Sequence, residues 1–171
     1  MAAVFETERL VLDELAADRD ELFVFELLNE PGFLENIGDR GVTDLAGARR
    51  YIETGPAASY ATNGFGLWRM VEKATGEPVG VCGLIKREGL ADPDVGYAVL
   101  ERFWGRGYAE EAARATLAHG RNALGIGRIV AITTPGNVGS IRVLEKIGLR
   151  PEGRIHLPDH GGESAYFVSD A

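Results

Sequence analysis

The segment Arg-Phe-Trp-Gly-Arg-Gly-Tyr-Ala-Glu at residues 102–110 constrains the fold of this chain more than any other feature. It follows an apolar, strand-like run at residues 94–100 and leads into a helical pattern at residues 108–124. Gly105 and Gly107 permit backbone conformations and close approaches that side chains would prevent. The first free N–H groups of a helix lie at the positive end of its dipole, so the sequence predicts an anion cradle between a strand and a helix.

Two common phosphate-binding loops do not fit this segment. A P-loop requires Gly-Lys-Ser/Thr, which is missing here, and Glu110 stands where the dinucleotide-binding pattern needs its third glycine. The pattern Arg-x-x-Gly-x-Gly is also short enough to arise by chance in a chain with 23 glycines. An ordinary strand-to-helix turn is therefore the alternative, and the flanking segments have to decide between the two.

Length and charge limit the classes of protein and ligand. A chain of 171 residues, 45% of them apolar, predicts one domain spanning residues 1–171 with a core of its own. The net charge of −8 opposes binding to nucleic acid and favours an amine ligand. An anionic ligand would therefore have to be held by local backbone donors and a few placed arginines.

Cysteine usage and hydropathy narrow the setting further. The single cysteine, Cys82, excludes an intrachain disulfide and a cysteine-based zinc site, and it predicts a reducing, cytoplasmic environment. No apolar run approaches the roughly 18 residues of a membrane span, so no membrane partner is expected.

Hydrophobic periodicity predicts the order strand, two helices, three strands, helix, strand, helix, strand. Asp18 with Glu21 forms a capping pair for the first helix, and Thr43 is the expected cap of the second. The predicted strands cover residues 7–12, 65–71, 79–85, 94–100, 128–133 and 164–168. The predicted helices cover residues 18–30, which Pro31 ends, 44–53, 108–124 and 140–147, which Gly148 ends. This pattern predicts an α+β protein with a mixed, mostly antiparallel sheet and helices on both faces.

Three separate segments of the chain resemble the GNAT superfamily of N-acetyltransferases. Residues 103–112, Phe-Trp-Gly-Arg-Gly-Tyr-Ala-Glu-Glu-Ala, are similar to the pyrophosphate loop of the branch that contains the ribosomal-protein N-terminal acetyltransferases. Asn137-x-x-Ser140, followed by a hydrophobic helix and Gly-Leu, is similar to the second cofactor segment of that branch. The opening Thr-Glu-Arg-Leu-Val-Leu at residues 7–12 is similar to its first strand. The resemblance implies acetyl-CoA as cosubstrate, no metal, and a primary amine as acceptor.

The resemblance also implies which residues bind acetyl-CoA. The pantetheine arm is expected along the backbone of Ala98, Val99 and Leu100, with Asn137 on its other side. Arg102 is expected to supply countercharge to the anionic cosubstrate. The pyrophosphate is expected on the N–H groups of the turn and the helix start, namely Gly105, Arg106, Gly107, Tyr108 and Ala109, with Arg106 adding countercharge as well.

The catalytic groups are harder to assign. Acyl transfer needs a neutral amine, a donor to the developing oxyanion and a proton for the leaving thiolate. The N–H of Val99 or Leu100 is the expected oxyanion donor if the two central strands splay apart as in the family. Many relatives place a tyrosine seven residues after the asparagine, where this chain has Leu144, so Ser140 is the candidate proton donor, with a helix N-cap as its alternative role.

The general base is left open between several carboxylates. Other members place a glutamate five residues before the asparagine, where this chain has Ile132. An α-amine is roughly a tenth neutral at pH 7 and a lysine far less, so the missing glutamate favours α-amines. His156 and His160 are four residues apart beside a proline and a glycine pair, which does not predict a metal site. The candidate bases are Asp94 and Asp159, with Glu88 and Glu152 behind them.

The predicted function is an N-acetyltransferase that acts on a peptide or protein N-terminus or on a small amine, by direct attack in a ternary complex. A CoA-binding module without turnover is the first alternative, and a nucleotide-binding protein of another fold is the second. The family implies an acceptor cleft around residues 33–41 and 156–163, but no motif there names the acceptor. Monomer and homodimer are both open.

Overall fold

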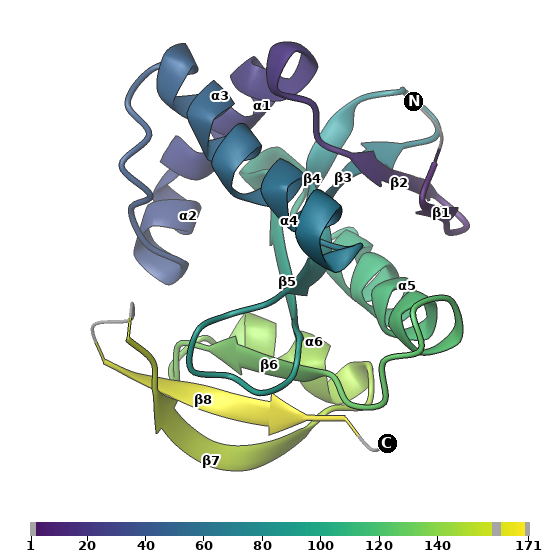
Figure 1. Ribbon diagram of the computed structural model, residues 1–171, viewed down its shortest axis with the longest axis vertical. Coiled ribbons are helices and arrows are strands. Elements are labelled where there is room, and N and C mark those ends of the chain that lie inside the picture. Colours follow the sequence, from purple (N-terminus) through teal and green to yellow (C-terminus); the bar gives the residue numbers. More distant parts are fainter. Residues whose placement is uncertain (1–2, 159–161, 170–171) are drawn as a thin grey trace.

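The computed structural model describes residues 3–158 and 162–169. Within these ranges the strands form one eight-stranded sheet in the order β1-β2-β3-β4-β5-β6-β8-β7 (Figure 1). All neighbouring strands are antiparallel except β5 and β6, which are parallel. The strands are β1 (Phe5–Glu6), β2 (Leu10–Glu14), β3 (Leu67–Glu72), β4 (Pro78–Ile85), β5 (Asp94–Val99), β6 (Val130–Thr133), β7 (Arg150–His156) and β8 (Glu163–Val168).

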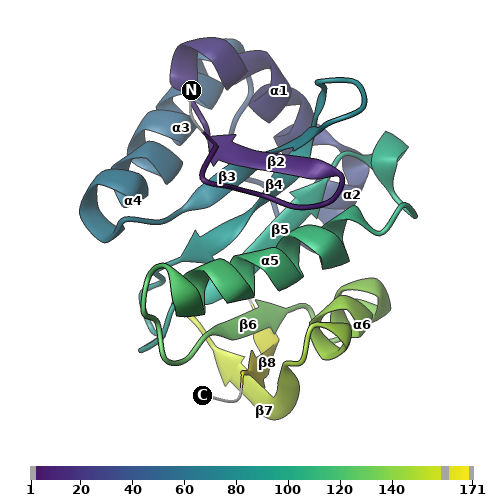
Figure 2. The ribbon, with the colours of Figure 1, turned by 90° about the vertical axis from the view of Figure 1, so that its right-hand side faces the viewer.

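Helices cover both faces of this sheet, as the sequence predicts (Figure 2). On one face, the carboxylate of Asp20 on α1 lies 3.1 Å from the guanidinium of Arg69 on β3. On the other face, Thr116 of α5 lies 3.4 Å from Cys82 of β4. The helices are α1 (Ala17–Asn29), α2 (Pro31–Asn36), α3 (Leu45–Thr54), α4 (Pro56–Asn63), α5 (Tyr108–Asn122) and α6 (Val138–Lys146), with a short 3-10 turn, η1 (Glu101–Phe103). No described helix is both long and apolar enough to cross a bilayer.

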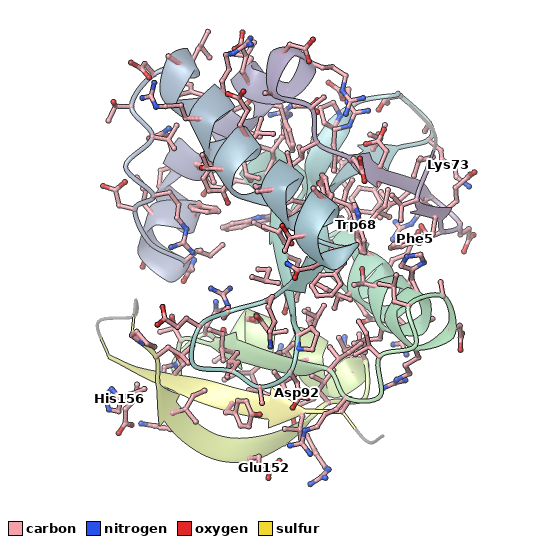
Figure 3. All side chains as sticks on the ribbon, viewed as in Figure 1. Phe5, Trp68, Lys73, Asp92, Glu152 and His156 are labelled. Carbon is pink, nitrogen blue, oxygen red and sulfur yellow. The ribbon has the colours of Figure 1, made fainter. Side chains whose placement is uncertain are left out.

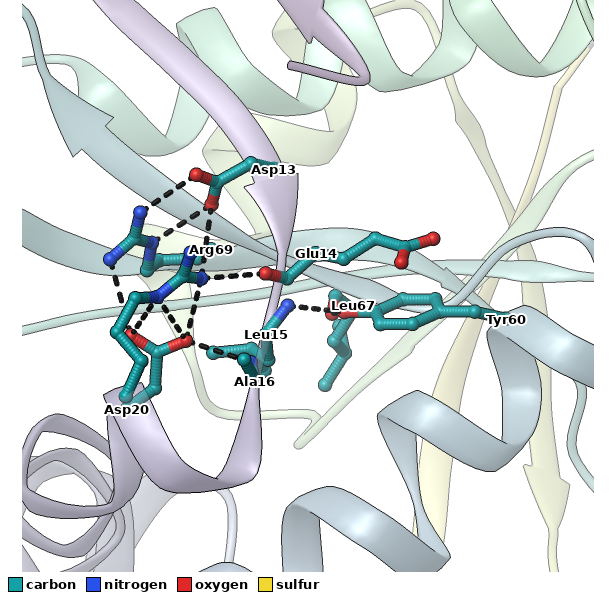
Figure 4. Close-up of polar contacts among 9 residues, drawn as sticks. Asp13, Glu14, Leu15, Ala16, Asp20, Tyr60, Leu67 and Arg69 are labelled. Atoms are coloured by element: carbon teal, nitrogen blue, oxygen red, sulfur yellow. Dashed lines mark hydrogen bonds and ion pairs between the residues drawn. The ribbon is translucent and has the colours of Figure 1, made fainter. Parts of the chain in front are cut away.

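A network of charges fastens β2, β3 and α1 together (Figure 4). The guanidinium of Arg69 donates to both oxygens of Asp13, at 2.8 and 2.7 Å, and to Asp20 at 3.1 Å. Arg19 adds a second cation to Asp20 at 2.7 Å. Both aspartates are buried, so these bonds supply the partners that a buried charge requires. Tyr60 of α4 ties the same corner by accepting from the Leu15 N–H at 3.1 Å.

Aromatic packing fixes the opposite face of this edge of the sheet. The ring of Phe5 on β1 packs edge to face against the ring of Trp68 on β3, with 5.5 Å between the ring centroids (Figure 3). Both rings also contact His119 of α5. Trp68 is almost completely buried. The first hairpin is therefore packed against α5, the helix that follows the glycine turn.

The sheet divides between β5 and β6. The only residues that pair these two strands are Asp94 and Val130, at the beginning of each strand. On the other side of β5, the Leu100 N–H donates to the Val79 carbonyl at 2.9 Å. Because backbone groups alternate in direction along a strand, Leu100 faces β4, whereas the backbone groups of Tyr97 and Val99 face the opening.

The structure corrects several predicted element boundaries. Residues 7–12 are not one strand, because the Thr7 N–H donates to the Leu10 carbonyl in the tight turn between β1 and β2. The cap of α3 is Asp44, whose carboxylate accepts from Gly47, and not Thr43. Asp18 and Glu21 do not cap α1 either, because the Ala16 N–H at its start donates to Asp20 at 2.8 Å.

Several elements were not predicted at all: β1, α2, α4 and β7. Pro31 does end α1, but it also opens α2, since proline suits the first turn of a helix. Pro56 opens α4 in the same way. β7 contains Pro151 and Gly153 and is almost entirely exposed, so it lacks the alternating apolar signal of a half-buried strand.

Candidate active site

A cleft of about 810 Å³ lies where β5 and β6 separate. One end is formed by the glycine turn and the beginnings of α5 and α6. The other end lies against α1, α2 and the residues after α2. Both segments expected at the acceptor cleft contribute to the lining: Phe33, Asn36, Ile37 and Arg40 from the first, and Gly162 and Glu163 from the second.

The glycine turn has the backbone that the sequence predicts for a cradle. Gly105 and Gly107 both have left-handed conformations, with φ of +80° and +79°. A Cβ at Gly105 would meet nothing within 4 Å, so the loop is open to a ligand. Within the described part of the chain no side chain caps α5, so its first N–H groups have no side-chain acceptor there. Gly105, Gly107, Tyr108 and Ala109 all line the cleft, and this arrangement fits a pyrophosphate.

The start of α5 is held in place from two sides. The Tyr108 hydroxyl donates to Glu72 at the end of β3, and the guanidinium of Arg9 lies over the Tyr108 ring at 4.5 Å. Arg9 also donates through its Nε to Glu111 at 2.7 Å, and the Thr7 hydroxyl donates to the same carboxylate at 2.5 Å. Hydrogen bonds from Tyr108 and Thr75 lower the pKa of Glu72. The Thr-x-Arg motif of the N-terminal segment therefore serves to position the cradle.

The two expected countercharges are already paired and do not line the cleft. Arg102 lies 2.6 Å from Glu26 of α1, and Arg106 lies 3.6 Å from Glu72. Both guanidiniums pack over the Phe103 ring, with each guanidinium carbon 5.0 Å from the ring centroid. Each side chain is about half exposed, so a phosphate could compete with its carboxylate partner.

The strand expected to hold pantetheine offers fewer free groups than the sequence suggested. Leu100 cannot provide the oxyanion donor, because its N–H is already bonded to Val79. The Val99 carbonyl accepts from the indole N–H of Trp104 at 2.7 Å. Trp104 is half exposed and lines the cleft. Of the two expected oxyanion donors this leaves the Val99 N–H, which faces the opening, and Ala98 lies beside it in the lining.

Ser140 and Asn137 meet at the start of α6. Asn137 is the N-cap, because its Oδ1 accepts from the Ser140 N–H at 3.2 Å. The alternative role of Ser140 as the cap is therefore wrong, and α6 begins at Val138 rather than at Ser140. The Ser140 hydroxyl instead lies 3.0 Å from the hydroxyl of Tyr97 on β5. Both residues line the cleft.

Tyr97 is a site residue that sequence reasoning missed. Burial raises its pKa to about 12, so the phenol keeps its proton at neutral pH. The sequence signal that could have found it is a tyrosine in the middle of an apolar strand. Tyr97 pairs with Cys82 of β4, so the two side chains lie on the same face of the sheet.

Of the candidate bases that lie within the described residues, Asp94 alone lines the cleft. It is 1% exposed, and the Arg87 Nε donates to both of its oxygens, at 3.0 and 3.1 Å. Burial raises the pKa of Asp94 to about 6, although Arg87 opposes the shift. Glu88 is exposed, and Glu152 is paired with Arg128 at 3.5 Å, and neither lines the cleft.

Asp159 and His160 lie outside the described residues. His156 is exposed and lies 3.7 Å from Glu163. Ile132 and Leu144, at the positions where relatives carry a glutamate and a tyrosine, both contribute apolar side chains to the cleft wall.

Comparison with known proteins decides the family. A family model described as an acetyltransferase (GNAT) domain matches residues 9–150. The Bacillus subtilis protein YkkB is 38% identical over 135 residues, which cover 77% of each chain. The chain belongs to the GNAT acetyltransferase family. This GNAT protein is an acetyl-CoA-dependent acetyltransferase, and the family and fold predicted from the sequence are confirmed.

Solved structures agree with this assignment. An acetyltransferase from Agrobacterium tumefaciens superposes with a TM-score of 0.83 at 25% identity, covering 100% of this chain and 95% of that one. The ribosomal-protein-S5-alanine acetyltransferase of Vibrio fischeri shares the fold with a TM-score of 0.80 at 17% identity, over 99% and 97% of the two chains. The aminoglycoside acetyltransferase AAC(6')-Ib, solved with coenzyme A, shares it with a TM-score of 0.74 at 21% identity, over 94% of each chain.

Proposed function

We propose that this GNAT acetyltransferase, as one catalytic domain spanning residues 1–171, transfers the acetyl group of acetyl-CoA to the primary α-amine of a peptide N-terminus or a small molecule. The observation that carries the proposal is the continuity of the cleft. The open glycine turn at one end and the apolar pocket at the other are joined through the gap between β5 and β6. A donor and an acceptor can therefore meet in one ternary complex without a covalent acyl-enzyme.

The donor would lie along the first half of this cleft. Gly105, Gly107 and the first N–H groups of α5 would hold the pyrophosphate, and Asn137 and Ala98 would flank the pantetheine arm. Arg102 and Arg106 would exchange their carboxylate partners for phosphate oxygens. Acetyl-CoA supplies the activated acetyl group as a thioester.

The chain's own groups would then manage charge and protons. In the transfer, a bond forms between the acceptor nitrogen and the acetyl carbon, the carbon–sulfur bond breaks, the nitrogen loses a proton and the sulfur gains one. The Val99 N–H faces the opening and would stabilise the developing oxyanion. The Ser140 hydroxyl would protonate the sulfur, and Tyr97, 3.0 Å away, would return a proton to Ser140 and regain its own from solvent.

The acceptor's own basicity determines how much help it needs from a base. The α-amine of a peptide N-terminus is roughly a tenth neutral at pH 7, so it can attack without a strong base, whereas a more basic amine needs one. Asp94, with its pKa raised to about 6, is the described carboxylate best suited to take the proton, and Asp159 is the second candidate.

Thiol release tests the proposal directly. The protein is incubated with acetyl-CoA and a panel of peptides and small amines while free CoA thiol is measured and N-acetylated products are identified by mass. We expect acceptor-dependent thiol release. Tight binding of CoA without thiol release from any acceptor would contradict the proposal and favour a CoA-binding module without turnover.

A further inference from the structure

The acceptor half of the cleft, on the α1 and α2 side of β5, is mainly apolar. Six aliphatic or aromatic side chains from the first helices and β3 form its wall: Val24, Leu27, Leu28, Phe33, Ile37 and Leu67. Gly96 of β5 lies at the base, where Ile85 packs so closely that an added Cβ would come within 3.1 Å of its side chain. This half of the cleft therefore suits an acceptor with an apolar body.

Three hydrogen-bond donors with unused capacity lie together in the same half. Arg40 and Tyr51 both line the cleft, and neither side chain has a hydrogen-bond or ion-pair partner within the described part of the chain. Arg87 bonds to Asp94 only through its Nε, which leaves its terminal amino groups without a partner among those residues. Burial raises the pKa of the Tyr51 phenol while Arg40 and Arg87 lower it, so both guanidiniums act on this hydroxyl.

The acidic side chains of the cleft are compensated. Among the described residues, the carboxylates in the lining are Asp94, Glu110 and Glu163. Asp94 is bound by Arg87, Glu110 by Arg114 at 3.2 Å, and Glu163 by Arg154 at 3.5 Å. Arg40 has no such partner among the described residues, so the described lining of the acceptor half carries an excess positive charge in a protein whose net charge is −8. At contact distance this local charge outweighs the distant ones, because salt screens charges beyond roughly 8 Å.

We propose that the acceptor is a small primary amine that carries both an apolar body and a carboxylate, the chemistry of a hydrophobic amino acid. Arg40, Tyr51 and Arg87 bind the carboxylate, and the apolar wall holds the side chain. The amine is left facing the gap between β5 and β6. This inference rests on the proposed acetyl transfer and names its substrate class. A polycationic acceptor finds no uncompensated carboxylate among the described lining residues.

A matched set of acceptors isolates the carboxylate. Phenylalanine, phenylalaninamide and phenethylamine share the ring and the primary amine, and only the first carries the carboxylate. We expect kcat/KM for phenylalanine to exceed that for either analogue by about tenfold or more, the value of one charge-assisted contact. The amide's amine is less basic and therefore more often neutral, so the comparison of phenylalanine with phenylalaninamide is biased against the proposal.

Two variants assign this preference to the cluster. Arg40→Gln should raise the KM for phenylalanine about tenfold and leave phenethylamine unaffected. Tyr51→Phe should weaken phenylalanine binding without lowering the melting temperature, because the hydroxyl has no described protein partner to lose. Arg49→Gln on α3, an exposed arginine paired with Glu21 outside the cleft, is the matched control and should behave as the wild type.

The outcomes separate this inference from the function on which it rests. Three outcomes would overturn the carboxylate subsite and leave acetyl transfer intact. They are equal turnover of the three amines, better turnover of kanamycin or of a peptide with an N-terminal alanine, and an Arg40→Gln variant that behaves as the wild type. Absence of turnover with every acceptor would contradict the proposed function. Calorimetric titration of phenylalanine into the CoA-bound protein then still tests the subsite, since binding that Arg40→Gln abolishes supports it and no binding overturns it.

Discussion

The hydroxyl of Tyr97 lies 3.0 Å from the hydroxyl of Ser140, and this contact joins β5 to the first turn of α6 across the gap in the sheet. The Tyr97 hydroxyl also lies 3.2 Å from the Ser140 carbonyl. The pair occupies the wall of the cleft between the cradle and the acceptor half. Leu144, which stands where the family resemblance implies a tyrosine, adds only an apolar side chain to the same cleft.

Substitution of this pair should affect turnover more than binding. A proton donor acts only as charge develops on sulfur, so Ser140→Ala should lower kcat by roughly 10² or more and leave the Kd for acetyl-CoA within a few-fold. Tyr97→Phe should lower kcat less, because it removes only the resupply of the proton. Steady-state kinetics, calorimetry and melting temperature are measured on both variants. A wild-type kcat in folded Ser140→Ala would rule out the catalytic role.

The glycine turn should control affinity for acetyl-CoA. Gly107→Ala or Gly105→Val forces a side chain onto a residue with a left-handed backbone and places it at the cradle, so the Kd should rise at least tenfold, about 1.4 kcal/mol. Gly125→Ala is the control, since Gly125 has φ of +69° but lies outside the cleft. It should share the loss of stability without the loss of affinity. Equal Kd values in all the variants would remove the cradle assignment.

The buried Asp94 should shape the pH dependence of stability. Its pKa is raised from 3.8 to about 6 in the folded chain, so the folded state holds this proton more tightly than the unfolded state. The group therefore contributes stability below about pH 4 that is lost as the pH rises through about 6. The free energy of unfolding of Asp94→Asn minus that of the wild type should therefore rise by roughly 3 kcal/mol as the pH goes from 4 to 7.

Urea unfolding at a series of pH values measures this difference. Asp92→Asn, which removes a partly exposed carboxylate from the neighbouring loop, is the control. Parallel pH profiles for wild type and Asp94→Asn would show that Asp94 is ionised at the same pH in both states.

The charge network of α1, β2 and β3 should dominate the stability of the acceptor side. Arg69→Met leaves Asp13 buried without its two-bond partner, at 2.8 and 2.7 Å, and should cost about 3 kcal/mol or more. Arg49→Met breaks an exposed pair of 3.4 Å and should cost about 0.5 kcal/mol or less. Chemical unfolding of the two variants compares these values, and a similar small cost for both would contradict the account of the network.

The sequence by itself determined the family, the strand–turn–helix cradle and the mixed sheet, because these depend on local signals. Gly105 and Gly107 are recognisable as backbone requirements, and the apolar periods of β4, β5 and α5 are long and regular. The short elements β1, α2, α4 and β7 carry no comparable period. These short segments acquire a structure only when the chain packs against β2, α1, α3 or β8.

Only the tertiary structure decided which side chains share a site. Ser140 was named from the sequence, but its partner Tyr97 lies 43 residues away and meets it through the folding of α6 beside β5. Arg102 and Arg106 were expected to be free for a ligand, and packing gave them Glu26 and Glu72 instead. The physical reason is that hydrogen bonds and ion pairs act over a few ångströms in space, whereas sequence patterns report only the local period of the backbone.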